Sequence, residues 1–248
     1  MSELGCGNCH SGLEPSKIVK KRAPDLSYSG IKYNEAFIYD YLKSPKKIRY
    51  HIGQSRMPNF GLSDNEALAL TKYLMSRKKL PNNKKLESKR IKKNNKGFKI
   101  IHNDYQCTVC HKLDDVGLLK STDLTDASVR LTNDWLYDLL LHPALYVPKE
   151  SPMPTFFNEN NSKDENTIKN IVGFLSYKAQ SKRSQLEKQL QNVEKKYPNI
   201  THNEGKLIFL SQNCLGCHTM SGEKNWFVSH NAPDLSAQKM RTKTSWLI

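Results

Sequence analysis

A five-residue pattern, Cys-x-x-Cys-His, occurs three times and uses all six cysteines of the chain, which is 248 residues long. Two thiols in this spacing can join covalently to the two vinyl groups of one haem, and the histidine that follows can bind its iron. The attaching cysteines would be Cys6, Cys9, Cys107, Cys110, Cys214 and Cys217. The iron-binding histidines would be His10, His111 and His218. The sequence therefore predicts three covalently attached haems, and a chain that must fold around each of them.

A Cys-x-x-Cys pair can also be half of a structural zinc site, since zinc takes four ligands and two pairs supply them. Three pairs leave a remainder when they are divided into four-thiolate sites, although a mixed Cys/His site remains open. A redox-active pair would need a βαβ context, and no such pattern is present. A histidine follows the second cysteine in every copy, and this favours haem.

The copies begin at residues 6, 107 and 214, which indicates modules of roughly a hundred residues each. Modules that small bury little apolar surface of their own, so a porphyrin at the centre would complete each core. The chain has no apolar run near 18 residues, so we expect no transmembrane segment. Its formal net charge of +15 favours acidic partners or anionic lipid. We expect no nucleic acid, because the charge comes without a recognition helix or stacking platform.

Markers downstream of each motif recur at matching offsets. Pro24-Asp25-Leu26-Ser27 in module one corresponds to Thr122-Asp123-Leu124-Thr125 in module two and to Pro233-Asp234-Leu235-Ser236 in module three. Each is followed by a cation and then an aromatic residue. These are Lys32 with Phe37, Arg130 with Trp135, and Arg241 with Trp246. The chain therefore repeats one structural plan.

The helices expected from this plan are short and amphipathic. One helix begins near Glu35 and stops at Ser44-Pro45, because proline ends a helix. Capping boxes are expected at Ser63 with Glu66, at Ser162 with Glu165 and at Thr201 with Glu204. Met57-Pro58 and Met153-Pro154 lie on loops before the first two of these boxes, where a methionine is better explained as an iron ligand than as core filler.

Two connectors separate the modules. Residues 77–96 carry ten Lys or Arg and one acid, Glu87, and we expect a solvated, self-repelling spacer rather than a docking patch. Residues 179–200 carry charge and glutamine, and the spacing of Leu186, Leu190 and Val193 predicts a short surface helix that ends near Pro198.

These motifs together resemble class I c-type cytochromes, the small all-helical electron carriers with His/Met ligation, here in tandem. The resemblance implies an all-α fold in which each small domain wraps one haem. It covers module one (1–78) and module two (95–179) nearly whole, and the first half of module three (201–248). The basic linker (79–94) and the connector (180–200) lie between them.

The resemblance also implies roles for particular residues. Met57 and Met153 would be sixth iron ligands. The carbonyl of Pro24 would accept from the other ring nitrogen of His10, and that of Pro233 from His218, whereas module two offers Thr122 at this place. The cations Lys32, Arg130 and Arg241 correspond to partners of the haem propionates.

In this family the first and last helices cross through a small residue and an aromatic. Gly97 with Phe174 fits that pattern in module two, whereas we expect Gly205 to lack its partner helix. Module one lacks the first helix and module three the last, as in an internal piece of a longer protein. The third haem would then receive only His218 from this chain, since Met240 falls at a packing position and His230 is a weaker candidate.

A haem held between His and Met has both axial positions filled, so its task is to exchange single electrons. The sequence thus predicts an electron carrier rather than an enzyme, serving an extracytoplasmic or membrane-bound redox complex. Such an assignment places the protein outside the cytoplasm, although no secretory signal is visible. One alternative is a haem subunit of a peroxidase or dehydrogenase with an open third haem. A zinc-binding or nucleic-acid-binding module is the remaining alternative.

Overall fold

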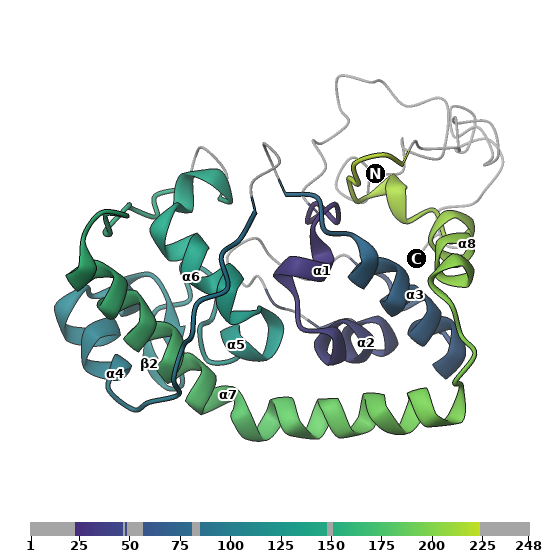
Figure 1. Cartoon of the computed structure of the whole chain (residues 1–248), viewed down its shortest axis with the longest axis horizontal. Helices are drawn as coiled ribbons and strands as arrows, with labels where there is room; N and C mark the ends of the chain where they lie inside the picture. Colours follow the sequence, from purple (N-terminus) through teal and green to yellow (C-terminus); the bar gives the residue numbers. More distant parts are fainter. Residues whose placement is uncertain (1–22, 47, 49–56, 81–84, 148–150, 224–248) are drawn as a thin grey trace, which may run out of the picture.

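The computed structural model describes residues 23–46, 48, 57–80, 85–147 and 151–223 (Figure 1). Within these ranges the regular structure is helical, apart from a small antiparallel hairpin of β1 (Lys112–Leu113) and β2 (Val116–Gly117). The predicted all-α fold class is confirmed. No helix in the described part of the chain is long and apolar enough to cross a membrane.

The first group of helices contains the module-one helices and one helix from far along the chain. They are α1 (Ser29–Lys32), α2 (Glu35–Lys43), α3 (Asp64–Ser76) and α8 (His202–Ser211). As predicted, α2 ends at Ser44, directly before Pro45. The predicted capping box at the start of α3 is present, and the Ser63 backbone N donates to the Glu66 carboxylate at 2.9 Å.

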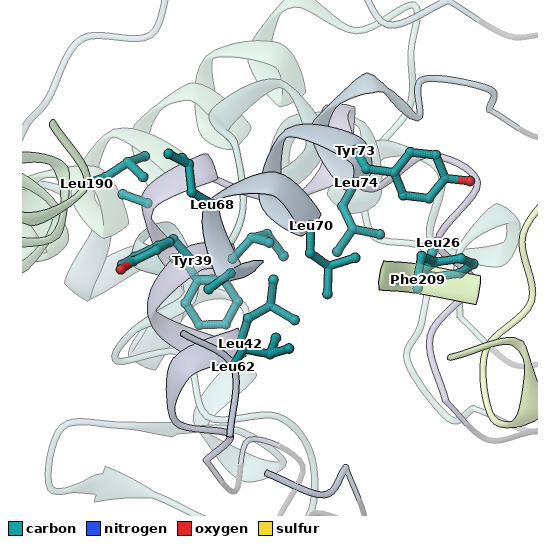
Figure 2. Close-up of a cluster of buried hydrophobic side chains, with 14 of the residues drawn as sticks. Leu26, Tyr39, Leu42, Leu62, Leu68, Leu70, Tyr73, Leu74, Leu190 and Phe209 are labelled. Carbon is teal, nitrogen blue, oxygen red and sulfur yellow. The ribbon is translucent and has the colours of Figure 1, made fainter. Parts of the chain in front are cut away.

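One buried cluster joins these helices. Figure 2 shows leucines of α2 and α3 between Leu190 on one side and Phe209 of α8 on the other. Phe209 is 1% exposed, and its ring lies 5.3 Å from that of Tyr73 on α3. The two ends of the described chain therefore share one hydrophobic core.

The second group of helices forms around module two. It contains α4 (Gly97–Lys99), the π-helix η5 (Ile100–Asp104), α5 (Ala127–Arg130), α6 (Asn133–Leu141) and the first part of α7 (Ser162–Lys196). The segment from Gly97 to Cys107 is one residue longer than the segment from Gly205 to Cys214. Since a π-turn holds an extra residue within a helix, η5 accommodates this insertion.

The predicted connector at 180–200 is not a separate element. Helix α7 runs unbroken for 35 residues, about 50 Å at a helical rise of 1.5 Å per residue, and contacts both groups of helices (Figure 1). Most residues of 180–200 are exposed, and Leu186 and Leu190 are buried in the module-one core, so this part of α7 is a surface helix that packs one face on that core. The periodicity correctly predicted a helix that ends near Pro198 and its apolar face, but not the core that this face covers.

The start of α7 also differs from prediction. Asn161 is the N-cap, and its side chain accepts from the Lys163 backbone N at 3.0 Å, so Ser162 is already helical. Asparagine caps a helix as well as serine does, which explains the shift by one residue. Glu165 pairs instead with Lys169 at 2.8 Å.

The basic linker, described except for residues 81–84, is more ordered than a self-repelling spacer. The Lys89 backbone N donates to Asp134 at 3.1 Å, and the Asn94 backbone N donates to the Gly173 carbonyl at 3.3 Å. Ile91 packs against the module-two core. The linker backbone therefore follows α6 and α7, while most of its charged side chains point to solvent.

Modules one and two meet through a reciprocal set of backbone contacts. Tyr33 and Leu131 form an antiparallel bridge, and each lies nine residues after its module's marker, Pro24 or Thr122. The Asn34 N donates to the carbonyl of Arg130 at 2.9 Å. In return, the Thr132 N donates to the carbonyl of Lys32 at 3.0 Å. Equivalent residues exchange equivalent bonds, so the modules are related by a local pseudo-two-fold axis.

Candidate functional site

The second and third Cys-x-x-Cys-His motifs adopt the same local structure. Each forms a single 3-10 turn, η6 (Cys107–Val109) and η8 (Cys214–Gly216). The residue before each turn is left-handed, with φ 49° at Gln106 and 50° at Asn213. In both turns the histidine backbone N donates to the carbonyl of the first cysteine at 2.9 Å. This turn places both thiols and the imidazole within five residues of chain.

Both histidines are oriented through Nδ1. His111 Nδ1 lies 2.6 Å from the Thr122 carbonyl, and His218 Nδ1 lies 2.8 Å from the Pro24 carbonyl. A carbonyl oxygen can only accept, so Nδ1 carries the proton and Nε2 carries the lone pair. That tautomer suits iron ligation through Nε2, with the carbonyl fixing the ring orientation.

The contact between His111 and Thr122 was predicted and is confirmed. The partner of His218 was not, because we expected Pro233 to accept from it and Pro24 to accept from His10. Pro24 accepts instead from His218. Pro233 and His10 lie outside the described residues, as do Cys6, Cys9 and Arg241.

The four described cysteines form no disulfide. Cys110 and Cys217 are exposed, whereas Cys107 and Cys214 are half-buried. Burial raises the pKa of Cys107, and it raises the pKa of Cys214 to about 12. Each turn therefore presents one accessible thiol and one that is protonated and shielded at neutral pH.

The two predicted axial methionines lie on non-helical segments, as the sequence indicated. Met57 is half-buried and packs against the same core cluster that contains Phe209 and Leu215. Met153 is half-buried, and its backbone N donates to the Ser151 hydroxyl at 3.3 Å.

The two described cations have different surroundings. The Lys32 ammonium lies over the rings of Tyr33 and Trp135, 5.2 Å from each centroid, and 5.6 Å from that of Tyr28. Arg130 donates through Nη2 to the Asp123 carbonyl at 2.9 Å. Their roles as propionate partners stay predictions.

The apolar residues around the second turn would fit a covalently held haem in their chemistry. Val109, Leu118 and Leu119 are 40–53% exposed, and the Leu118 N donates to the Thr108 carbonyl at 3.0 Å, which holds this apolar group against the second motif. Exposed apolar side chains beside a motif are those that a porphyrin would cover.

A shared zinc site between motifs two and three finds no support. The described ranges contain no group of three or more His, Cys, Asp or Glu that could hold a metal ion. A haem iron with one histidine and one methionine needs no such group, so this observation bears on the zinc alternative alone.

The contact between the third motif and module one is the feature that sequence reasoning missed. Its signal was present in the helix crossings. In module two, a Cβ on Gly97 would lie 2.4 Å from the Phe174 Cβ. A Cβ on Gly205 would lie 2.8 Å from the Tyr73 Cβ. The expectation that Gly205 lacks its partner helix is therefore wrong, because α3 is that helix.

Comparison of this chain with protein-family models, with curated proteins and with solved structures gave no match. The resemblance to class I cytochromes thus rests on the sequence motifs.

Proposed function

We propose that this protein is an electron-transfer c-type cytochrome with three covalently attached haems. One observation carries the proposal. The second and third motifs fold into the same turn, and in both the histidine Nδ1 is held by a backbone carbonyl at the same place in the repeated plan. Histidines that bind a metal usually donate their other ring N–H to a carboxylate or a backbone carbonyl, and both histidines here have such a partner.

The residues of each turn have distinct tasks in this proposal. The two thiols of each motif would hold the haem through thioether bonds to its two vinyl groups. The histidine would supply the proximal nitrogen, and its carbonyl partner holds the tautomer and raises the basicity of the ring. When bound, the iron supplies reversible one-electron exchange, and a methionine ligand raises its potential.

Covalent haem stoichiometry tests the proposal. Denatured protein in alkaline pyridine should show three haems per chain that acid acetone does not extract. Peptide mass analysis should place them on the three cysteine pairs. Recovery of zinc, or of haem that acid acetone removes, would refute the proposed function.

The alternative of a peroxidase or dehydrogenase subunit differs in having one open haem. Addition of peroxide distinguishes the two, since a haem with both axial positions filled should show no spectral change. Catalytic consumption of peroxide at one haem would support the alternative.

We further propose an extracytoplasmic location and an acidic redox partner, such as the docking surface of a membrane-bound oxidoreductase complex. The support is the net charge of +15, with an exposed basic segment at 85–96 whose backbone is fixed against α6 and α7. A fixed array of cations steers an anionic partner better than a free one, because its position relative to the haems is constant.

A further inference from the structure

The third motif is built into the core of module one at the opposite end of the chain. The His218 ring meets the Pro24 carbonyl at 2.8 Å, as the His111 ring meets Thr122 in module two. A second contact matches as well. The Leu26 N donates to the carbonyl of Thr219 at 2.8 Å, and the Leu124 N donates to the carbonyl of Lys112 at 2.8 Å. Thr219 and Lys112 each directly follow the motif histidine.

The helix crossing supplies a third correspondence. Helix α8 crosses α3 at Gly205, where a Cβ would lie 1.9 Å from the Ala69 carbonyl oxygen. Helix α4 crosses α7 at Gly97, where a Cβ would lie 2.8 Å from the Asn170 carbonyl oxygen. Residues 201–223 thus pack on residues 23–46 and 57–80 in the way that the first helix and motif of module two pack on the rest of that module.

Polar contacts of Glu223 and Arg77 also hold this arrangement together. Glu223 accepts from the Tyr73 hydroxyl at 2.9 Å and pairs with Lys206 at 3.0 Å. Arg77 donates to the carbonyl of Ser221 at 2.7 Å. The Glu223 side chain is only 8% exposed, so these bonds act where water competes little.

The methionine of this unit is Met57. Met57 and Cys214 both pack against one buried cluster, which also contains Leu215 of the third motif. The sequence plan gives each unit one loop methionine before its last helix, and here that helix is α3.

We propose that residues 201–223 form one haem-binding unit with residues 23–46 and 57–80, in which Met57 is the sixth ligand of the iron bound by His218. This rests on the proposed function. The third haem then has a complete ligand pair from this chain, contrary to the expectation from sequence. In the sequence, the two halves of this haem-binding unit are separated by the whole of module two.

The decisive experiment removes the competing first motif. In a Cys6→Ala, Cys9→Ala background, two covalent haems should remain, at Cys107/Cys110 and Cys214/Cys217. Adding Met57→His should then lower the reduction potential of one of the two and abolish its sulfur-to-iron absorption band. Met75→Leu, at another methionine packed on the same cluster, is the matched control and should leave both haems unchanged.

The outcomes separate this proposal from the proposed function. Absence of covalent haem at Cys214 and Cys217 would overturn both. Two attached haems that are both unaffected by Met57→His would overturn the ligand assignment and leave the electron-carrier proposal standing.

Hydrogen exchange of the unsubstituted chain gives a readout that depends on no variant. The Leu26 amide donates to Thr219, and it should be strongly protected together with the amides of α3 and α8. Exchange of this amide at the rate of an open loop would overturn the split unit, whatever the haems show.

Discussion

The crossing of α8 over α3 can be tested by one methyl group at Gly205. An alanine Cβ there would lie 1.9 Å from the Ala69 carbonyl oxygen, whereas ordinary contact begins near 3.4 Å. The helices would therefore have to separate by about 1.5 Å, the difference between these two distances. A gap of roughly 1 Å already forfeits up to half of a dispersion contact, so the packing of Phe209 on Tyr73 would be largely lost.

Two effects of opposite sign compete in Gly205→Ala. Alanine favours a helix over glycine by about 1 kcal/mol, whereas forcing extra volume into a packed contact costs about 1–3 kcal/mol, and more when backbone must move. Since the contacted atom is a backbone oxygen on a packed helix, we expect the cost to prevail. With the cost near the upper end of its range, about 2–3 kcal/mol, the net loss in the free energy of unfolding should be about 1–2 kcal/mol.

Urea unfolding followed by far-UV circular dichroism measures this difference. Gly97→Ala, at the equivalent crossing in module two, should change stability in the same direction. Leu207→Ala, at an α8 position that is 69% exposed, should change it by less than about 0.5 kcal/mol. A Gly205→Ala protein more stable than the parent would mean that this face of α8 is open to solvent, and the crossing would be wrong.

Three further predictions follow from other parts of the molecule. Asn34→Ala should lower the free energy of unfolding in urea by about 1–3 kcal/mol, because its amide donates to the carbonyls of three module-two residues at 2.9–3.0 Å. An unchanged midpoint would mean that this contact between modules one and two is not formed in solution. Burial, with repulsion from Glu194, raises the pKa of Glu35, so its charged form disfavours folding above the ordinary value of 4.5. Glu35→Gln should therefore stabilise the protein at neutral pH, with a gain that shrinks as the pH falls through that range, and a loss at neutral pH would contradict this. Met153→His should lower the potential of the haem at His111, as read by redox titration, and an unchanged titration would exclude Met153 as its ligand.

Local signals in the sequence predicted the parts of the fold that depend on neighbours in the chain. Pro45 fixed the end of α2, and the pair Ser63 and Glu66 fixed the start of α3, since these effects act within one helical turn. The contact of His111 with Thr122 was equally accessible, because both residues belong to one short segment. The turn geometry at the third motif follows from the same local pattern.

Features that depend on the burial of one face against a distant element were not accessible in the same way. The spacing of Leu186 and Leu190 predicts an apolar stripe, but it does not say that the stripe covers the module-one core. In the linker, the many Lys and Arg residues obscure the signal of the Ile91 contact and of the backbone bonds to Asp134 and Gly173. Charge composition describes the side chains of that segment and not the course of its backbone.

The pairing of the third motif with module one poses a harder problem, because repeats offer interchangeable surfaces. A glycine-bearing helix fits any partner helix of the repeat, so neither Gly97 nor Gly205 selects one. Selection comes from residues that differ between the repeats. Tyr73 stands where module two has Phe174, and only the tyrosine hydroxyl can donate to Glu223.

Lys72 adds a second polar contact that favours the pairing of α3 with α8. Its ammonium donates at 3.0 Å to the carbonyl of Ile200, the residue before the N-cap of α8. A bond to a buried or half-buried charge is worth about 1.5–3 kcal/mol, more than the difference between two similar apolar crossings. The lowered pKa of Glu223 agrees with this. Burial alone would raise it, yet the bonds from Lys206 and Tyr73 and the charge of Arg77 outweigh burial. The residues that recur in each module thus specify how the two halves of a haem-binding unit pack together. The polar residues that do not recur specify which two halves pair.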